Sequence, residues 1–475
     1  DVYKRQTYCS ENAMLLGDIL KGEWGFSGFV MSDFFWGTHS TVPAATAGLD
    51  LEMQTAIVYG DPVVEAVNGA ELDLSNVDAH VRRILRAQFC YELDANPPVV
   101  DESKLETEET LALAREVATR SIVLLRNDGL LPLSKTRSES IVLVGPLADL
   151  QNIGDTDGSS GVKSSEVVTI AEGLLGRTDV AASIAFLPGE LSDPQEELLV
   201  SAADLVIVAL GLTQEDEGEG QSGPPVPALG AGDRDSYGLP GEQAAFLTQI
   251  LSLNGNVIVV LEGGSAIDMS SWFADTRAVL MAWYPGVQGG HAIADVLFGD
   301  ANPSGRLPVS FPARIEDLQA FPGLELDVTY ERYHGYQRLD KNGTAPFAPF
   351  GFGLSYSAFE YGEPSVDNPK PSVEDDSLTV AVSVRNASSR AGIETVQVYA
   401  GAVSPGVDMP VRKLVGFSQV SLEPGETKRV ELEISVRELA YFQENQGWVL
   451  DPGLYRFELG SSVADLPVFV EVQLR

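Results

Sequence analysis

The sequence predicts an α/β protein of several domains that ends in an antiparallel β-sandwich. Four near-continuous apolar runs lie between residues 141 and 283, as strands covered by helices on both faces require. Segments with helical periodicity lie between or after them. Beyond about residue 360 the apolar period changes to two, which is typical of half-buried antiparallel strands. The length of 475 residues fits roughly three domains at about 150 residues each.

Each predicted element rests on its own pattern. The apolar runs are 141–144, 205–210, 257–261 and 278–283, and the expected helices are 73–90, 106–120, 241–253 and 290–298. In the sandwich, the alternating strands are 378–384, 430–434, 455–459 and 468–474, with turns at Pro424-Gly425 and at 451–453. Near the start, the short apolar run 29–31 predicts a buried strand that ends before Asp33.

Composition excludes several classes of function. The net charge of −38 repels phosphate backbones and anionic lipid, so we expect neither nucleic acid nor membrane as a partner. No apolar stretch is long enough to span a bilayer. The four histidines are scattered, and Cys9 and Cys90 form no C-x-x-C pair, so we expect no metal. The sequence does not decide whether the two cysteines are buried thiols or one bridge.

The first residues carry no export signal. Residues 1–6 are polar and charged, and the chain does not begin with methionine, so the sequence is interpreted as a fragment. The compartment is therefore left open, and so is assembly into a homo-oligomer.

The glycine-rich segment 154–164 is interpreted as a surface turn. In a phosphate-binding loop, glycine directly precedes Lys-Ser/Thr, but here Val162 intervenes before Lys163. No G-x-G-x-x-G follows Val144, which disfavours a nucleotide-binding protein. Asp155 and Asp157 supply only the start of a calcium loop.

Two carboxylates are candidates for catalysis. Asp33 follows a predicted strand, where α/β barrels place catalytic residues, and the aromatic Phe34, Phe35 and Trp36 come next. The alternative for Asp33 is a capping or loop-stabilising role. Glu219 lies in the acidic run 215–220 after the strand ending near residue 211, where crowded carboxylates would raise its pKa as a general acid requires. The alternative for that run is a solvated loop.

Several long segments in order resemble glycoside hydrolase family 3. They are GEWGFSGFVMSD at 22–33, THS at 38–40, AGLDLEM at 47–53, Asp233-Arg234, LPG at 239–241, WYPG at 283–286, ADVLFGD at 294–300, NPSGRLP at 302–308 and FGFGLSY at 350–356. The resemblance runs the whole length of the chain. It implies a β-glucosidase-like enzyme that needs neither metal nor organic cofactor.

The resemblance also implies roles for the candidate residues. Asp33 would be the nucleophile and Glu219, from the second domain, the acid/base, with Glu217 as the alternative because this loop varies in length. Retaining hydrolysis of a terminal β-D-glucosyl residue needs two such carboxyls about 5–5.5 Å apart. The family usually has tryptophan directly after the nucleophile. Because Phe34 stands there, Phe34 and Trp36 are both candidates for the substrate-binding ring.

The implied architecture has three parts. A (β/α)₈ barrel takes about 250 residues, but only 32 precede Asp33, so the barrel is expected to be incomplete. The expected organisation is a C-terminal barrel portion at 1–95, linker and helix at 96–120, an α/β sandwich with a mostly parallel sheet at 121–315, a connecting segment at 316–359 and a fibronectin type III-like β-sandwich at 360–475.

Two expectations follow for activity. These 475 residues alone should be inactive or nearly so, because the early barrel strands that hold the non-reducing sugar are missing. The alternatives are a β-xylosidase or β-N-acetylglucosaminidase of the same family, or a carbohydrate-binding relative without catalysis. The presence of both Asp33 and Glu219 argues against the last of these.

Overall fold

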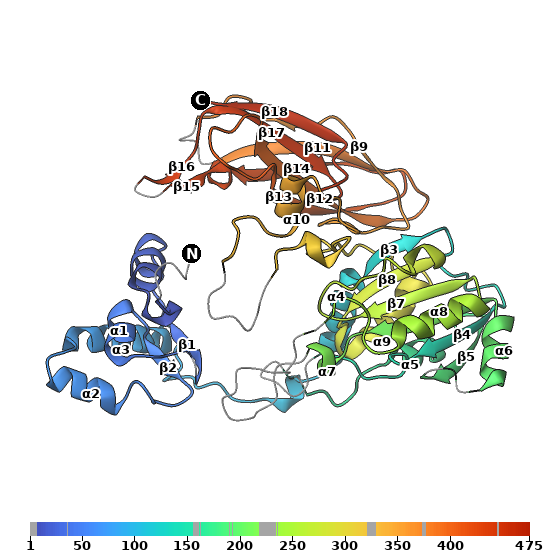
Figure 1. Ribbon diagram of the computed structural model, residues 1–475, viewed down its shortest axis with the longest axis horizontal. Helices are drawn as coiled ribbons and strands as arrows, with labels where there is room; N and C mark the ends of the chain where they lie inside the picture. Colours follow the sequence, from blue (N-terminus) through green and yellow to red (C-terminus); the bar gives the residue numbers. More distant parts are fainter. Residues whose placement is uncertain are drawn as a thin grey trace. The chain divides into compact units, whose positions relative to one another are not determined.

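The computed structural model describes residues 7–35, 37–154, 161, 163–189, 191, 193–217, 234, 236–320, 329–372, 377–443 and 446–475. The chain forms two compact units (Figure 1). One comprises Asp1–Lys104 with Phe321–Glu331, and the other Leu105–Ala320 with Arg332–Arg475. We call them unit 1 and unit 2.

Unit 1 combines a two-stranded parallel sheet with helices. Its elements are η2 (Cys9–Glu11), the π-helix η3 (Met14–Glu23), β1 (Met31–Phe34), α1 (Thr41–Ala47), β2 (Leu51–Met53), α2 (Asp61–Asn68), α3 (Leu74–Cys90) and η4 (Glu102–Lys104). β1 pairs with β2 in parallel. Asp73 caps α3 by accepting a hydrogen bond from the Ser75 N–H, so the helix expected over 73–90 is confirmed.

The expectation of a buried strand ending before Asp33 is wrong. β1 begins at Met31 and includes Asp33, and of its four residues only Ser32 is buried. The chain returns to pair with β1 only at Leu51, and the partner strand β2 is three residues long. A strand covered by so little of its own unit keeps apolar side chains such as Met31 in contact with solvent.

Unit 2 begins with an α/β sandwich. Its strands are β3 (Val123–Asn127), β4 (Ser140–Gly145), β5 (Ser183–Pro188), β6 (Leu205–Gly211), β7 (Val257–Glu262) and β8 (Ala278–Trp283), in the spatial order β3-β8-β7-β6-β4-β5. Only the pairing of β3 with β8 is antiparallel. The four apolar runs are therefore confirmed as β4, β6, β7 and β8 of a mostly parallel sheet.

Helices cover both faces of this sheet (Figure 1). One face packs against α4 (Glu108–Ser121), α5 (Ile170–Leu175) and α9 (Gly289–Leu297), and the other against α6 (Pro194–Ala202) and α8 (Gln243–Leu253). The short helix α7 (Gln214–Glu217) follows β6, and the 3-10 turns η5 (Phe273–Asp275), η6 (Gly286–Gln288) and η7 (Ile315–Asp317) lie in connections. Every residue of β6 and β7 is buried, which explains why β6 and the first five residues of β7 carry no charged or polar side chain.

The second part of unit 2 is an antiparallel β-sandwich. One sheet contains β9 (Phe359–Tyr361), β10 (Ser365–Val366), β11 (Ser377–Asn386) and β14 (Thr427–Ser435). The other has the order β13 (Lys413–Leu422), β12 (Gly392–Ala402), β17 (Gly453–Gly460) and β18 (Val468–Leu474). A hairpin of β15 (Tyr441–Gln443) and β16 (Gly447–Val449), the turn η8 (Val436–Leu439) and α10 (Gly335–Asn342) complete it. Alternate residues of both sheets form its core, as the period of two predicted.

Candidate active site

Asp33 is the third residue of β1, and its side chain is exposed. Its Oδ1 accepts the Phe34 N–H at 2.7 Å. The hydroxyl of Ser32 donates to the Asp33 carbonyl at 2.8 Å and accepts the N–H of Met53 in β2 at 2.9 Å. The backbone of Asp33 is therefore fixed against β2, while its carboxylate remains accessible.

The residues after Asp33 turn back tightly on the strand. A Cβ at Gly37 would come within 2.5 Å of the Asp33 backbone nitrogen, so a residue without a side chain is required there. The Phe34 side chain is 43% exposed and that of Phe35 49%. Phe34 thus leaves an accessible ring beside Asp33, as a sugar-binding residue needs. Trp36 lies outside the described residues.

A buried charge cluster holds the start of β1. Asp50 accepts the Val30 N–H at 2.8 Å, forms an ion pair with Lys21 at 2.7 Å and is hydrogen-bonded to His80 Nδ1 at 2.8 Å. Burial opposes ionisation of Asp50, but hydrogen bonds from His80, Lys21 and Val30 outweigh it and lower its pKa. Asp50 therefore stays ionised and links η3, α3 and the residue that precedes β1. Sequence reasoning assigned it no role, although it lies in the AGLDLEM segment.

Glu217, the alternative acid/base, occupies the end of α7 near the carboxyl edge of the sheet in unit 2. Its Oε2 accepts the Gly264 N–H at 2.6 Å and the Tyr284 hydroxyl at 2.8 Å, and its Oε1 accepts the Ser265 hydroxyl. Burial, followed by the hydrogen bond to Glu217, raises the pKa of Tyr284, so its hydroxyl is a donor at neutral pH. Both oxygens of Glu217 are therefore occupied.

Arg234 binds the same turn. Its Nη1 donates to the Ser265 hydroxyl at 2.7 Å and the Ala266 carbonyl at 2.8 Å, and it lies 3.7 Å from Glu217 Oε1. Glu217 and Arg234 thus attach two points of the chain, seventeen positions apart, to the turn that follows β7. Glu219 falls between these two residues and lies outside the described residues, as does Asp233.

A buried carboxyl lies at the end of β7. Glu262 is 3% exposed, and its Oε2 accepts a hydrogen bond from Asn152 Nδ2 at 2.9 Å. Burial raises the pKa of Glu262 to about 8, because the single amide donor only partly offsets the loss of solvation. Its strand approaches Gly211 of β6 so closely that a Cβ there would overlap the Glu262 carbonyl. Glu262 is therefore a neutral acid at pH 7, and it lies two residues before Gly264, whose N–H binds Glu217.

The described part of the chain has neither a metal-binding cluster nor a membrane-spanning helix. Among these residues, no three His, Cys, Asp or Glu side chains are grouped so that they could hold a metal ion. No helix there is long and apolar enough to cross a membrane. Cys9 and Cys90 are both exposed and free.

Comparison with known protein families identifies two regions. Residues 122–356 match the glycosyl hydrolase family 3 C-terminal domain. Residues 394–463 match a fibronectin type III-like domain. The matches fall on the α/β sandwich with its following segment and on the β-sandwich.

Curated relatives match almost the whole chain. Thermostable beta-glucosidase B of Acetivibrio thermocellus is 34% identical over 97% of this chain and 60% of its own length. Beta-glucosidase BoGH3A of Bacteroides ovatus is 32% identical over 97% of this chain and 66% of its own length. An exo-alpha-(1->6)-L-arabinopyranosidase of Bifidobacterium breve is 32% identical over 98% of this chain and 62% of its own length. The chain thus spans about three fifths to two thirds of these relatives.

Solved structures agree in fold. The beta-D-glucoside glucohydrolase of Trichoderma reesei superposes with a TM-score of 0.90 at 26% identity, covering 99% of this chain and 71% of that one. A family GH3 beta-glucosidase of Bifidobacterium adolescentis gives 0.86 at 29% identity, over 99% and 68%. The chain belongs to glycoside hydrolase family 3.

Proposed function

We propose that this chain carries the nucleophile and the acid/base of a retaining, exo-acting β-glucosidase that releases terminal β-D-glucosyl residues. The observation that carries the proposal is Asp33, an accessible carboxylate on a backbone fixed at β1, inside a segment that resembles the nucleophile region of the family. Relatives named beta-glucosidases match 97% of the chain, which supports the choice of sugar.

In the proposed mechanism, Asp33 attacks the anomeric carbon as Glu219 protonates the departing alcohol oxygen. The C–O bond to the leaving group breaks and a glycosyl-aspartate ester forms. Glu219 then removes a proton from water, which attacks the anomeric carbon and releases glucose with its original configuration. The mechanism requires the two carboxyl groups to approach within about 5–5.5 Å.

We assign the acid/base role to Glu219 rather than Glu217. A general acid must hold a proton and direct it at the glycosidic oxygen. Both oxygens of Glu217 already accept hydrogen bonds, from Gly264, Tyr284 and Ser265, and Arg234 lies nearby. Glu217 is therefore suited to anchoring the loop and poorly suited to proton transfer.

We further propose that residues 1–95 are part of a (β/α)₈ barrel, followed by a linker and helix at 96–120, the sandwich at 121–315, a connection at 316–359 and the fibronectin type III-like domain at 360–475. Such a barrel needs eight strands, and β1 and β2 are the strands of the described part of unit 1. Purified residues 1–475 should therefore turn over aryl β-glucosides little or not at all. Substantial turnover would contradict this proposal.

The stereochemistry of the reaction tests the mechanism. The protein encoded by the gene is mixed with an aryl β-D-glucoside, and the first glucose released is followed by proton NMR. A retaining enzyme releases the β-anomer first, before mutarotation. Initial release of the α-anomer would mean that the configuration is inverted. It would therefore exclude a mechanism through one covalent glycosyl-aspartate.

A second sugar has specific support. The exo-alpha-(1->6)-L-arabinopyranosidase of Bifidobacterium breve is 32% identical to this chain, about as similar as the beta-glucosidases. The preferred sugar is found by comparing hydrolysis rates on the aryl β-glucoside, β-xyloside, β-N-acetylglucosaminide and α-L-arabinopyranoside. We expect the largest kcat/KM for the glucoside, and a larger value for any other sugar would reassign the substrate.

A further inference from the structure

A groove runs along the seam between the two parts of unit 2. Two cavities, of about 530 Å³ and about 470 Å³, share Arg120 of α4 and Ser304 in their walls, so they adjoin each other and together make up this groove. We call it the seam groove. Each volume falls in the range of about 300–1,000 Å³ that is usual for ligand sites. Asp33 and Glu217 do not line it.

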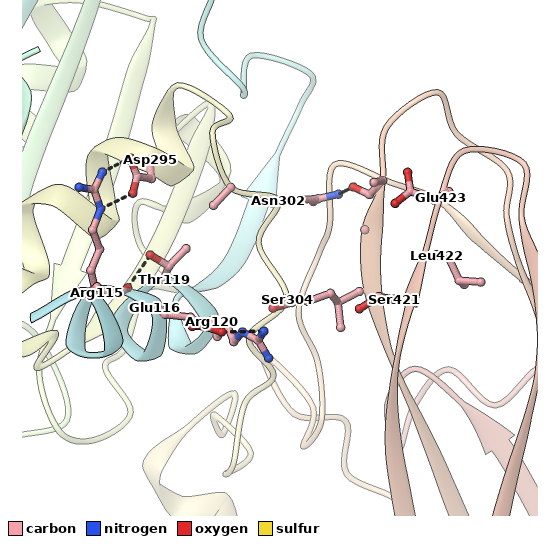
Figure 2. A pocket seen from close by; sticks show the side chains of 15 residues that line it. Arg115, Glu116, Thr119, Arg120, Asp295, Asn302, Ser304, Ser421, Leu422 and Glu423 are labelled. Atoms are coloured by element: carbon pink, nitrogen blue, oxygen red, sulfur yellow. Dashed lines mark hydrogen bonds and ion pairs between the residues drawn. The ribbon is translucent and has the colours of Figure 1, made fainter. Parts of the chain in front are cut away.

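The walls of the seam groove come from defined elements. Figure 2 shows Arg115, Glu116, Thr119 and Arg120 of α4 on one side of the first cavity, with Ser421, Leu422 and Glu423 on the other. On the β-sandwich side, the lining follows β13 and the residue after it, from Leu414 to Glu423. Nine steps of about 3.3 Å make the strand segment that carries these lining residues about 30 Å long.

Hydrogen bonds and an ion pair hold the two walls together. Asn302, on the α/β side, donates to the Ala391 carbonyl and the Ser357 hydroxyl, both at 2.9 Å. Arg306 donates to Glu394 at 2.6 Å, and Glu394 is 2% exposed. The groove is therefore formed before any ligand arrives, which lowers the entropic cost of binding.

Two side chains in the lining are exposed to solvent and make few contacts with the protein. Phe417 is 65% exposed, and Gln419 is exposed with a single long contact of 3.4 Å to Thr395. Three cross-strand pairs of β12 and β13 line the groove, namely Ile393 with Ser421, Thr395 with Gln419 and Gln397 with Phe417. Trp283 lies in the second cavity, and its indole N–H is taken up by the Ser121 carbonyl at 3.1 Å. The lining therefore offers an exposed ring and an exposed amide on β13, with the Trp283 ring on the α/β side.

The charges of the groove point to a neutral ligand. Arg115 forms a bidentate pair with Asp295 at 2.6 and 2.7 Å, and Arg120 pairs with Glu116 at 2.7 Å. Arg306 pairs with Glu394. Each of the three guanidinium groups in the lining is therefore already neutralised, while Glu423 adds a further carboxylate. Phosphates and other anions would find no free cation there.

We propose that the seam groove binds a neutral oligosaccharide chain, as a second sugar site separate from the proposed catalytic residues. Sugar rings have apolar C–H faces that stack on aromatic rings and hydroxyl groups that match amide and hydroxyl partners. Phe417 and Trp283 supply the rings, and Gln419 supplies the amide. The choice of a β-linked glucose chain as probe rests on the proposed function, whereas the site itself does not.

The test measures binding without hydrolysis. Calorimetric titration of Asp33→Asn, made in the protein encoded by the gene, with a β-linked glucose tetrasaccharide should show saturable binding at a site additional to the proposed catalytic one. Phe417→Ala in the same background should weaken the affinity about tenfold, or about 1.4 kcal/mol. Phe469→Ala is the matched control, because Phe469 is 54% exposed on β18 and lies outside the groove. It should leave the affinity unchanged.

Three results would overturn the proposal. One is the absence of saturable binding for the glucose tetrasaccharide and for the matching xylose and N-acetylglucosamine chains. Another is an equal affinity of Phe417→Ala and the parent protein. The third is tighter binding of a sulfated tetrasaccharide than of the neutral one, because this requires a free cation. Failure of the proposed function, seen as a missing adduct at Asp33 in the protein encoded by the gene, would leave this result unaffected.

Discussion

Asp33 and Glu217 are both carboxylates close to a strand end, but their surroundings differ. Asp33 is exposed, and its hydrogen bond from Phe34 comes from the next residue along the chain. Glu217 accepts hydrogen bonds from Gly264 and Ser265 in the turn after β7 and from Tyr284 after β8. These donors lie 47, 48 and 67 positions later in the chain. A carboxylate that must attack carbon needs a free oxygen, whereas one with every oxygen engaged holds a loop. The contrast supports the proposal that Asp33 reacts with the sugar and that Glu217 anchors its loop.

The largest expected effect is on Asp33. Asp33→Ala in the protein encoded by the gene should lower kcat by about 10⁴-fold or more, since the covalent step loses its nucleophile. Because the side chain is exposed, the thermal midpoint of unfolding should change little. Asp18→Ala, which removes another exposed acid of unit 1, is the control. A kcat for Asp33→Ala within tenfold of the parent would remove Asp33 from the mechanism.

The next largest expected effect is the difference in hydrolysis rates between variants of Glu219 and of Glu217. Glu219→Ala should slow hydrolysis of substrates with poor leaving groups by about 10³-fold and of dinitrophenyl glucosides far less, because good leaving groups need no proton. Azide, a nucleophile that needs no general base, should restore turnover. Glu217→Gln should lower the rates of both substrate classes by a similar, smaller factor and show no azide rescue. The reverse pattern would make Glu217 the acid/base.

A smaller effect is expected when Asp50, which holds the residue before β1, is replaced. Asp50→Asn leaves Lys21 and His80 without their buried partner, which should cost about 3 kcal/mol of local stability. Because the pKa of Asp50 is lowered in the folded state, its contribution is present above the unfolded pKa of about 4 and is lost as the pH falls below it.

Hydrogen exchange of the β1 and α3 amides measures this effect. At pH 7 we expect faster exchange in Asp50→Asn than in Asp78→Asn, which changes an exposed acid on α3. Equal exchange in both variants would show that the cluster does not hold β1.

The smallest expected effect is on the pH dependence of stability, through Glu262 at the end of β7. Its pKa of about 8 lies above the unfolded value, so it stabilises the fold fully below about pH 4.5 and loses this contribution as the pH rises through 8. Raising the pH from about 5.5 to about 7 should therefore lower the stability of unit 2 by about 2 kcal/mol. Glu262→Gln, neutral at every pH, should remove this dependence in urea unfolding. An unchanged pH profile in Glu262→Gln would show that Glu262 is ionised in the folded protein.

Sequence patterns predicted the strands whose apolar residues are continuous or follow a regular period. The buried strands β6 and β7 are apolar at almost every position, and the strands of the β-sandwich alternate, so their faces can be identified from neighbouring residues alone. Asp33, Phe34 and the acidic run were found because they follow apolar runs. The same reasoning misplaced the end of β1, since a short strand with one short partner gives a weak pattern.

What the sequence did not predict depends on contacts between distant residues. Asp50 meets Lys21 and His80 across 29 and 30 positions, and no periodicity links them. The Glu217 contacts cross the end of the sheet in the same way. The seam groove needs residues of α4 beside β13, about 300 positions later in the chain. Only the folded arrangement of the strands and helices brings such groups together.

The proposed mechanism requires Asp33 to form the covalent bond to the sugar. The most direct measurement incubates the protein encoded by the gene with a 2-deoxy-2-fluoro-β-glucosyl fluoride, which forms the glycosyl-enzyme rapidly but releases it slowly. Peptide mass spectrometry then locates the added sugar. We expect it on the peptide that contains Asp33, and on no peptide of Asp33→Ala. An adduct on any other carboxylate, Glu217 included, would contradict the proposed mechanism.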